Sequence, residues 1–107
     1  MKLIKNSHHI IPKAVYRQFD DLAEILARDA TGNRIDLVSK FHGNHPAYST
    51  WITKKLIEAK GDGKLTPAKV EQVLNEARTE INKALNNWID SDFTVNMNSY
   101  FKIKLSE

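Results

Sequence analysis

The stretch Phe41-His42-Gly43-Asn44-His45-Pro46-Ala47-Tyr48 decides how this chain is organised, together with an earlier stretch, Ser7-His8-His9-Ile10-Ile11-Pro12. All four histidines of the sequence lie in these two stretches. A neutral imidazole nitrogen coordinates metal ions, and the ring takes up a proton near neutral pH. The pattern therefore predicts a site that combines a metal ion with a general base, provided that the fold brings the two stretches together.

The composition predicts one folded domain over residues 1–107. Hydrophobic residues make up 41% of the sequence and charged residues 27%, which is typical of a globular chain with one core. No apolar run approaches the roughly 20 residues of a membrane-spanning helix, so no membrane association is expected. The sequence contains no cysteine, which excludes disulfides, thiolate zinc ligands and thiol nucleophiles. A net charge of +3 permits a polyanionic partner without requiring one.

Apolar spacing and turn residues predict an α+β chain in the order strand, helix, strand, loop, helix, helix and tail. Pro12 ends the first strand because it lacks a backbone donor, and Pro46 and Pro67 suit first positions of helices. The predicted ranges are an extended segment over 2–12, a helix over 13–30, a strand over 34–39, a loop over 40–45, a helix over 46–60, a helix from 67 to about 89–92, and a strand-like tail over 93–105.

If the two strands pair, the histidines meet where the second strand gives way to a helix. His42 and His45 are three residues apart across a turn that contains Gly43, so both rings can converge on one ion. A third ligand would come from the pair His8-His9, and the remaining histidine would deprotonate a water molecule. Neighbours on a regular strand point to opposite faces, so both members of the pair serve one site only if the strand is irregular there.

These residues resemble the HNH/endonuclease VII superfamily, and in particular its bacterial toxin branch with an Ala-His-His or Ser-His-His signature. The resemblance covers roughly residues 6–57. It rests on the histidine pair before an apolar-Pro segment, on Asn33-Arg34-Ile35-Asp36-Leu37, and on the second histidine stretch. Three positions depart from the pattern: Ser7 replaces alanine, Val38 stands where proline is usual, and one residue fewer separates His42 from Gly43.

The resemblance implies a small ββα-metal (His-Me finger) core over about residues 6–60, with a helical extension and tail over 64–107. It implies a metal-dependent endonuclease that hydrolyses DNA, with RNA left open as a substrate. His9 would be the general base, Asn33 would orient it, and one divalent ion (Mg, Mn, Zn or Ni) would be held by three ligands: His8, His42 and His45.

The same resemblance implies a biological setting. Such domains act as antibacterial toxins at the C-terminal end of a larger delivery protein, and a cognate immunity protein blocks them in the producer. The chain would be secreted or delivered by contact from a bacterium and would act in the cytoplasm of the target cell.

Two other functions fit the residues. In the first, the four histidines close a structural zinc site in a binding module without catalysis, although such sites usually contain thiolates. In the second, the helices form the surface of a plain interaction domain. At the level of single residues, Asn33 also fits a turn that ends a helix. Tyr48 fits the core or a hydrogen-bonding support, and Trp51 and Trp88 are expected to pack in the core.

Overall fold

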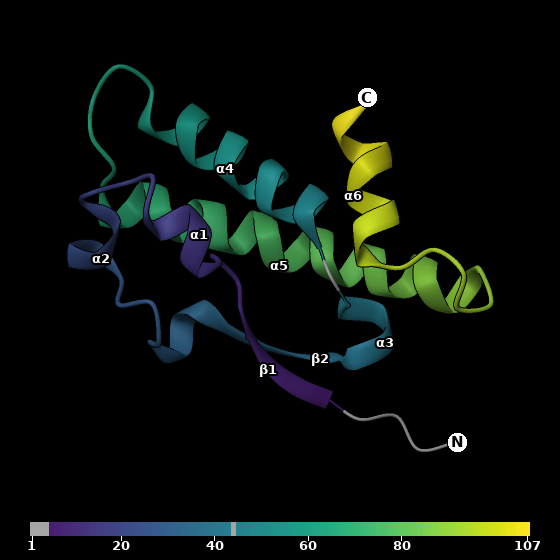
Figure 1. The fold of residues 1–107 in the computed structure, drawn as a ribbon. Helices are drawn as coiled ribbons and strands as arrows, with labels where there is room; N and C mark the ends of the chain where they lie inside the picture. Colours follow the sequence, from purple (N-terminus) through teal and green to yellow (C-terminus); the bar gives the residue numbers. More distant parts are fainter. Residues whose placement is uncertain (1–4, 44) are drawn as a thin grey trace.

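The fold is mixed α+β, with a small two-stranded antiparallel sheet and several helices (Figure 1). The computed structural model describes residues 5–43 and 45–107. The elements in chain order are β1 (Lys5–His9), α1 (Lys13–Tyr16), α2 (Leu22–Ile25), the 3-10 turn η1 (Thr31–Asn33), β2 (Arg34–Val38), α3 (Ser39–His42), α4 (Pro46–Lys60), α5 (Pro67–Asp90) and α6 (Met97–Leu105).

The two strands pair, which is the condition for the two histidine stretches to meet, with His8 opposite Ile35 and His9 opposite Arg34. β1 ends at His9, earlier than the predicted range of 2–12, of which residues 2–4 lie outside the described part of the chain. Ile10 and Ile11 follow the strand and are fully buried. The histidine pair therefore lies at the end of β1, where the chain turns into the core.

Two long helices form the base on which the sheet region packs. α4 and α5 begin at Pro46 and Pro67, as predicted, and the Thr66 side chain caps α5 by accepting a hydrogen bond from the Lys69 N–H at 3.3 Å. In Figure 1 α5 runs the length of the molecule, and α4 and α6 pack against it and against each other. No helix in the described part of the chain is long and apolar enough to cross a bilayer.

One core joins the sheet region to the C-terminal helices. Trp51 and Trp88 are buried in it, as predicted. Phe101 from α6 packs edge-on against Tyr48, with ring centroids 5.0 Å apart. The largest fully buried side chains come from both the N-terminal region and the C-terminal helices: Ile10, Ile11, Val15, Leu22, Phe41, Tyr48, Ile52, Leu56, Val70, Ile81, Met97 and Phe101. The C-terminal helices thus support the segment that carries the histidines.

The predicted helix over 13–30 is wrong. The structure has two single-turn helices there, α1 and α2, joined by a turn. Asp21 lies at the N-cap position of α2, which short acidic side chains favour over a helix interior. The bend lets both Val15 and Leu22 reach the core, and the Tyr16 hydroxyl closes the loop by donating to the Leu26 carbonyl at 2.7 Å.

The predictions for 40–45 and 93–105 also need correction. Residues 39–42 form one helical turn, α3, and Met97–Leu105 form a helix, α6, in place of a strand-like tail. The Asn96 side chain caps α6 by accepting from the Ser99 N–H at 2.9 Å. Met97 and Phe101 are buried four residues apart, which is the helical spacing; the alternation along 100–105 is coincidental, since Ile103 is exposed.

Candidate metal and catalytic site

Three of the four histidines lie in ring contact at the junction of the sheet and α4. We call His8, His42 and His45 the histidine cluster. The rings of His8 and His42 stack with centroids 3.4 Å apart and an interplanar angle of 16°, and His45 meets His42 edge-on at 4.3 Å. These residues come from the end of β1, the end of α3 and the N-cap of α4. The fold therefore brings together the three residues predicted as metal ligands.

Two ring nitrogens in the histidine cluster are buried and unpaired. Nε2 of His8 and Nδ1 of His45 are inaccessible to solvent and have no hydrogen-bond partner among the described residues. A buried polar atom without a partner costs about 1–3 kcal/mol, so such atoms require an explanation. Binding of a metal ion would explain both unpaired nitrogens, because neutral imidazole nitrogen is a common ligand of zinc and nickel.

The ring orientations do not yet form a coordination shell. Within residues 5–43 and 45–107, no three histidine or acidic side chains are arranged around a common point in a way that would hold an ion. The His8 and His42 rings are nearly parallel, whereas ligands of one ion aim their nitrogens at the same point. The donor set fits a divalent ion, and binding one would require rotation of these side chains.

Burial keeps the histidine cluster in the form that binds metal. Burial first, and then the nearby His45 and His8, lower the pKa of His42 to about 4. Burial also lowers the pKa of His8 and of His45. All three imidazoles are therefore neutral at pH 7, and no proton has to leave before a cation binds.

Gly43, which lies between His42 and His45 in the sequence, has an unusual backbone conformation. Its φ of 45° lies in the left-handed region, and its ψ is −149°. This combination is almost restricted to glycine. Asn44, the next residue, lies outside the described residues. Gly43 follows directly on His42, the last residue of α3.

His9 points away from the histidine cluster and contacts an acidic residue. Its Nε2 lies 2.8 Å from Oδ1 of Asp29, which precedes η1. The pKa of the Asp29 carboxyl is lowered, first by the hydrogen bond from His9 and then by the guanidinium groups of Arg28 and Arg34. His8 and His9 thus turn to different neighbours, as the alternation of a strand requires. The sequence predictions missed Asp29 because it lies 20 residues from its partner, inside a segment interpreted as a helix.

Asn33 is fully buried and acts on the backbone next to the histidine pair. Its Oδ1 accepts from the Ile11 N–H at 2.8 Å, and its Nδ2 donates to the carbonyls of Ile11 at 3.2 Å and Arg28 at 2.8 Å. Its own carbonyl accepts from the Ile10 N–H at 2.8 Å. Asn33 therefore holds the two residues that follow His9, and any effect on the imidazole passes through the backbone.

Tyr48 holds the same segment from the other side. Its hydroxyl, buried in the core, donates to the Ile10 carbonyl. Its ring meets His45 edge-on, with centroids 5.6 Å apart. Asn98 of α6 supports the start of α4 by accepting from the Ala47 N–H at 3.0 Å. The prediction that Tyr48 is a core or supporting residue is confirmed.

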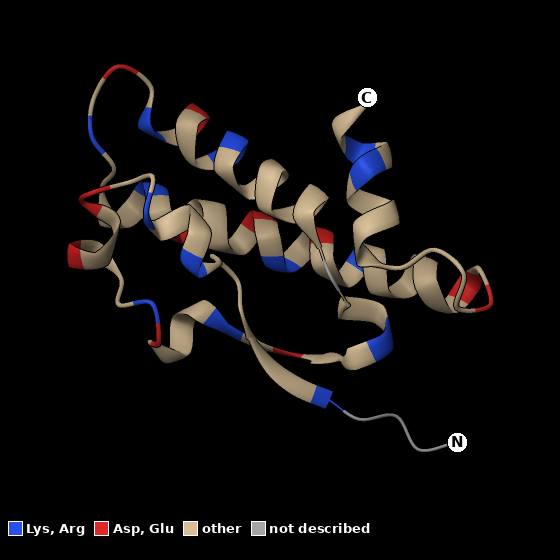
Figure 2. Cartoon of the chain, viewed as in Figure 1, with Lys and Arg blue, Asp and Glu red and all other residues tan. Residues whose placement is uncertain are grey.

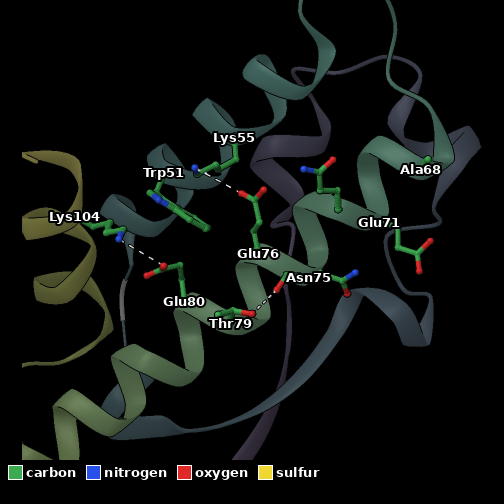
Figure 3. Close-up of a pocket in the computed structure, with 10 residues that line it drawn as sticks. Trp51, Lys55, Ala68, Glu71, Asn75, Glu76, Thr79, Glu80 and Lys104 are labelled. Carbon is green, nitrogen blue, oxygen red and sulfur yellow. Dashed lines mark hydrogen bonds and ion pairs between the residues drawn. The ribbon is translucent and has the colours of Figure 1, made fainter.

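A hollow lies away from the histidines, between α4, α5 and α6 (Figure 3). It is a groove of about 800 Å³ with Trp51 in its wall. Lys55 pairs with Glu76 at 3.6 Å and Lys104 with Glu80 at 3.5 Å across it. Both lysines of the groove are therefore paired with a glutamate. Over the rest of the chain, Figure 2 shows basic and acidic residues interspersed along the helices, without one large basic face in this view.

Comparison of the chain with protein-family models, with curated proteins and with solved structures gave no match. The function is therefore argued from the chemistry of the site.

Proposed function

We propose that the chain is a metal-dependent endonuclease that hydrolyses phosphodiester bonds of DNA, built on a ββα-metal core of β1, β2 and α4 with added helices. One observation carries the proposal. Three imidazoles from separate elements lie in ring contact with two buried, unpaired nitrogens, next to a fourth histidine that a carboxylate holds. This combination supplies a candidate ligand set and, at the next residue of β1, a candidate base.

The metal ligands in this proposal are His8, His42 and His45. An imidazole shell favours zinc or nickel in affinity, while magnesium or manganese can support turnover at such sites. When bound, a divalent ion supplies positive charge that stabilises the phosphate and the leaving oxygen in the transition state. The three ligands are neutral, so they leave the full charge of the ion available.

His9 is the general base in this proposal. Its imidazole would accept a proton from water, the water oxygen would form a bond to phosphorus, and the bond from phosphorus to the 3′ oxygen would break. Asn33 would act as a positioning residue, because it holds the backbone of Ile10 and Ile11 directly after His9. Because side chains alternate along β1, His8 can act as a ligand while its neighbour His9 acts as the base.

The contact of His9 with Asp29 favours a catalytic over a structural metal site. A structural zinc site closes its shell with four protein ligands, whereas a catalytic site keeps one position open. His9 bonds to a carboxylate and faces away from the histidine cluster, which leaves three histidines for the ion. A binding module stabilised by zinc and four histidines would need His9 to leave Asp29.

The proposed setting is that of an antibacterial toxin module. The chain would be part of a larger protein that a bacterium secretes or delivers by contact, would act in the cytoplasm of the target cell, and would be inhibited by an immunity protein. The order of motifs in the two histidine stretches supports this setting.

The test is cleavage of supercoiled plasmid by the purified chain with magnesium, manganese, zinc, nickel or EDTA. His9→Ala removes the base and leaves the histidine cluster, so it should abolish nicking while zinc binding is retained. Asp62→Ala, an exposed acidic residue in the turn after α4, serves as the control. Single-stranded and structured RNA are tested in parallel.

Metal-dependent nicking that is lost in His9→Ala would support the proposal. Cleavage of RNA alone would correct the substrate. A folded wild-type chain that cleaves neither nucleic acid with any of the metals, and that unfolds on chelation, would support the structural zinc module instead.

A further inference from the structure

The hydrogen bond between His9 and Asp29 determines which nitrogen of the imidazole is free. A carboxylate only accepts hydrogen bonds, so at 2.8 Å from Oδ1 the Nε2 of His9 carries the hydrogen. In a neutral imidazole the other nitrogen then holds the lone pair. The contact therefore leaves Nδ1 of His9 as the atom that can accept a proton.

The Asp29 carboxylate is itself fixed from several sides. Arg34 lies opposite His9 in the sheet, and its Nη2 is 3.5 Å from Oδ1 of Asp29. Its Nε donates to the Asp29 carbonyl at 3.3 Å, and its Nη1 donates to Oγ of Ser7 at 3.0 Å. Arg28 lies 3.6 Å from Oδ2 of the same carboxylate. Figure 2 shows the basic and acidic residues that alternate along β2 and the segment before it.

The arrangement is partly open to solvent, and the residues of the histidine cluster are likewise half-buried. The side chain of His9 is 29% exposed and that of Asp29 is 61% exposed. An exposed ion pair contributes little to the stability of a fold, because water screens it. The contact with Asp29 can instead fix the orientation of the His9 ring relative to an incoming water molecule.

We infer that Asp29 is a second positioning residue, which acts on the His9 ring directly: it holds the imidazole in the tautomer with a hydrogen on Nε2, so that Nδ1 accepts the proton of the attacking water. The inference rests on the proposed nuclease function and assigns a role to a residue outside both histidine stretches. In the proton transfer, Nδ1 gains the proton, the imidazolium forms, and the carboxylate of Asp29 stabilises its charge while remaining ionised.

The kinetic test compares Asp29→Ala and Asp29→Asn with Asp62→Ala, which removes the same charge from an exposed turn. We expect Asp29→Ala to lower kcat by about 10- to 100-fold. This is less than the roughly 10⁴-fold loss on replacing the buried carboxylate partner of a catalytic histidine, because Asp29 is exposed. KM should stay within about twofold, since ground-state binding of the substrate is unchanged. Asp29→Glu should recover part of kcat, and Asp62→Ala should match the wild type.

The second readout is the ¹⁵N spectrum of the His9 ring in the full, metal-free chain, assigned with His9→Gln. The wild type should show a protonated Nε2 and an unprotonated Nδ1, and Asp29→Ala should show a mixture of tautomers. A wild-type ring with its hydrogen on Nδ1 would overturn the inference. So would equal kcat values for Asp29→Ala and Asp62→Ala in a protein whose activity requires His9.

The two readouts separate this inference from the proposed function. If the wild type cleaves no nucleic acid, the nuclease proposal fails. The spectrum then decides alone whether Asp29 fixes the tautomer of His9. If the wild type is active and the tautomer does not change in Asp29→Ala, the nuclease proposal stands and the positioning role is refuted.

Discussion

Replacing Asn33 by alanine should cost about 3 kcal/mol of unfolding free energy. The side chain is fully buried and makes hydrogen bonds to the N–H and carbonyl of Ile11 and to the carbonyl of Arg28. Each such bond contributes a net of about 1 kcal/mol, and three together contribute about 3 kcal/mol. Because Ile11 is buried too, its N–H would lose its partner without gaining water, which can raise the total to about 5 kcal/mol.

The assay is urea unfolding followed by circular dichroism. With a slope of about 2 kcal/mol per M, a loss of 3 kcal/mol lowers the midpoint by about 1.5 M, and the slope itself should not change. Asn86→Ala, an exposed asparagine on α5, is the matched control and should change stability by less than about 0.5 kcal/mol.

Asn33→Asp tests whether donation by Nδ2 is what matters. Aspartate keeps the shape and can still accept from the Ile11 N–H, but its second oxygen would face the carbonyls of Ile11 and Arg28. Burial and these carbonyls raise the pKa of such a carboxyl. The loss of stability relative to wild type should therefore be present at pH 7 and shrink as the pH falls. A loss below about 1 kcal/mol for Asn33→Ala would refute the reasoning.

Further predictions concern Gly43, the hydrogen bond from Tyr48 to Ile10, and zinc binding by the proposed ligands. Gly43→Ala should destabilise by about 1–2 kcal/mol in thermal unfolding, because its φ of 45° strains any L side chain, whereas Gly63→Ala should have a much smaller effect. Tyr48→Phe leaves a buried backbone carbonyl without its donor and should cost about 1–2 kcal/mol by the same measurement. Zinc at about 100 times its Kd should stabilise the wild type by about 2.7 kcal/mol, and neither His45→Ala nor the wild type in EDTA should show this gain. Burial raises the pKa of the Tyr48 hydroxyl, so this hydroxyl loses its proton at a lower pH in the unfolded chain than in the folded one. The free energy of unfolding should therefore fall as the pH rises above about 10. A free energy of unfolding that stays constant through that range, with tyrosinate absorbance appearing at the usual pKa, would contradict this prediction.

The sequence predicted the parts of the fold that local chemistry determines. Pro46 and Pro67 begin the two long helices, and a periodic apolar stripe identifies α5 along its whole length. Alternation predicts the strand over 34–39, whereas its pairing with the first strand is a condition that the sequence does not decide, and the structure shows that the two strands pair. Such signals lie within a few residues of the element that they specify, so they can be read from one sequence.

The failures concern features determined by contacts between distant residues. The segment over 13–30 has the spacing of one helix, yet packing of Leu22 and the Tyr16 hydrogen bond favour two short turns. The partner of His9 lies 20 residues away and has no local signature. The cap at Asn96 was a local signal for α6, and the alternation of the following residues obscured it.

The hydrogen bonds from Tyr48 to Ile10 and between Asn33 and Ile11 have a consequence for how the candidate site forms during folding. Tyr48 reaches Ile10 across 38 residues of sequence, and Asn33 reaches Ile11 across 22. Neither the two-stranded sheet nor α4 alone could bring the imidazoles together, because each of these hydrogen bonds joins separate elements. Closing such long loops carries an entropic cost that only a nearly complete core repays. We therefore expect the histidine cluster to form only when these separate elements pack together, so that an extended chain carries the same residues without their juxtaposition.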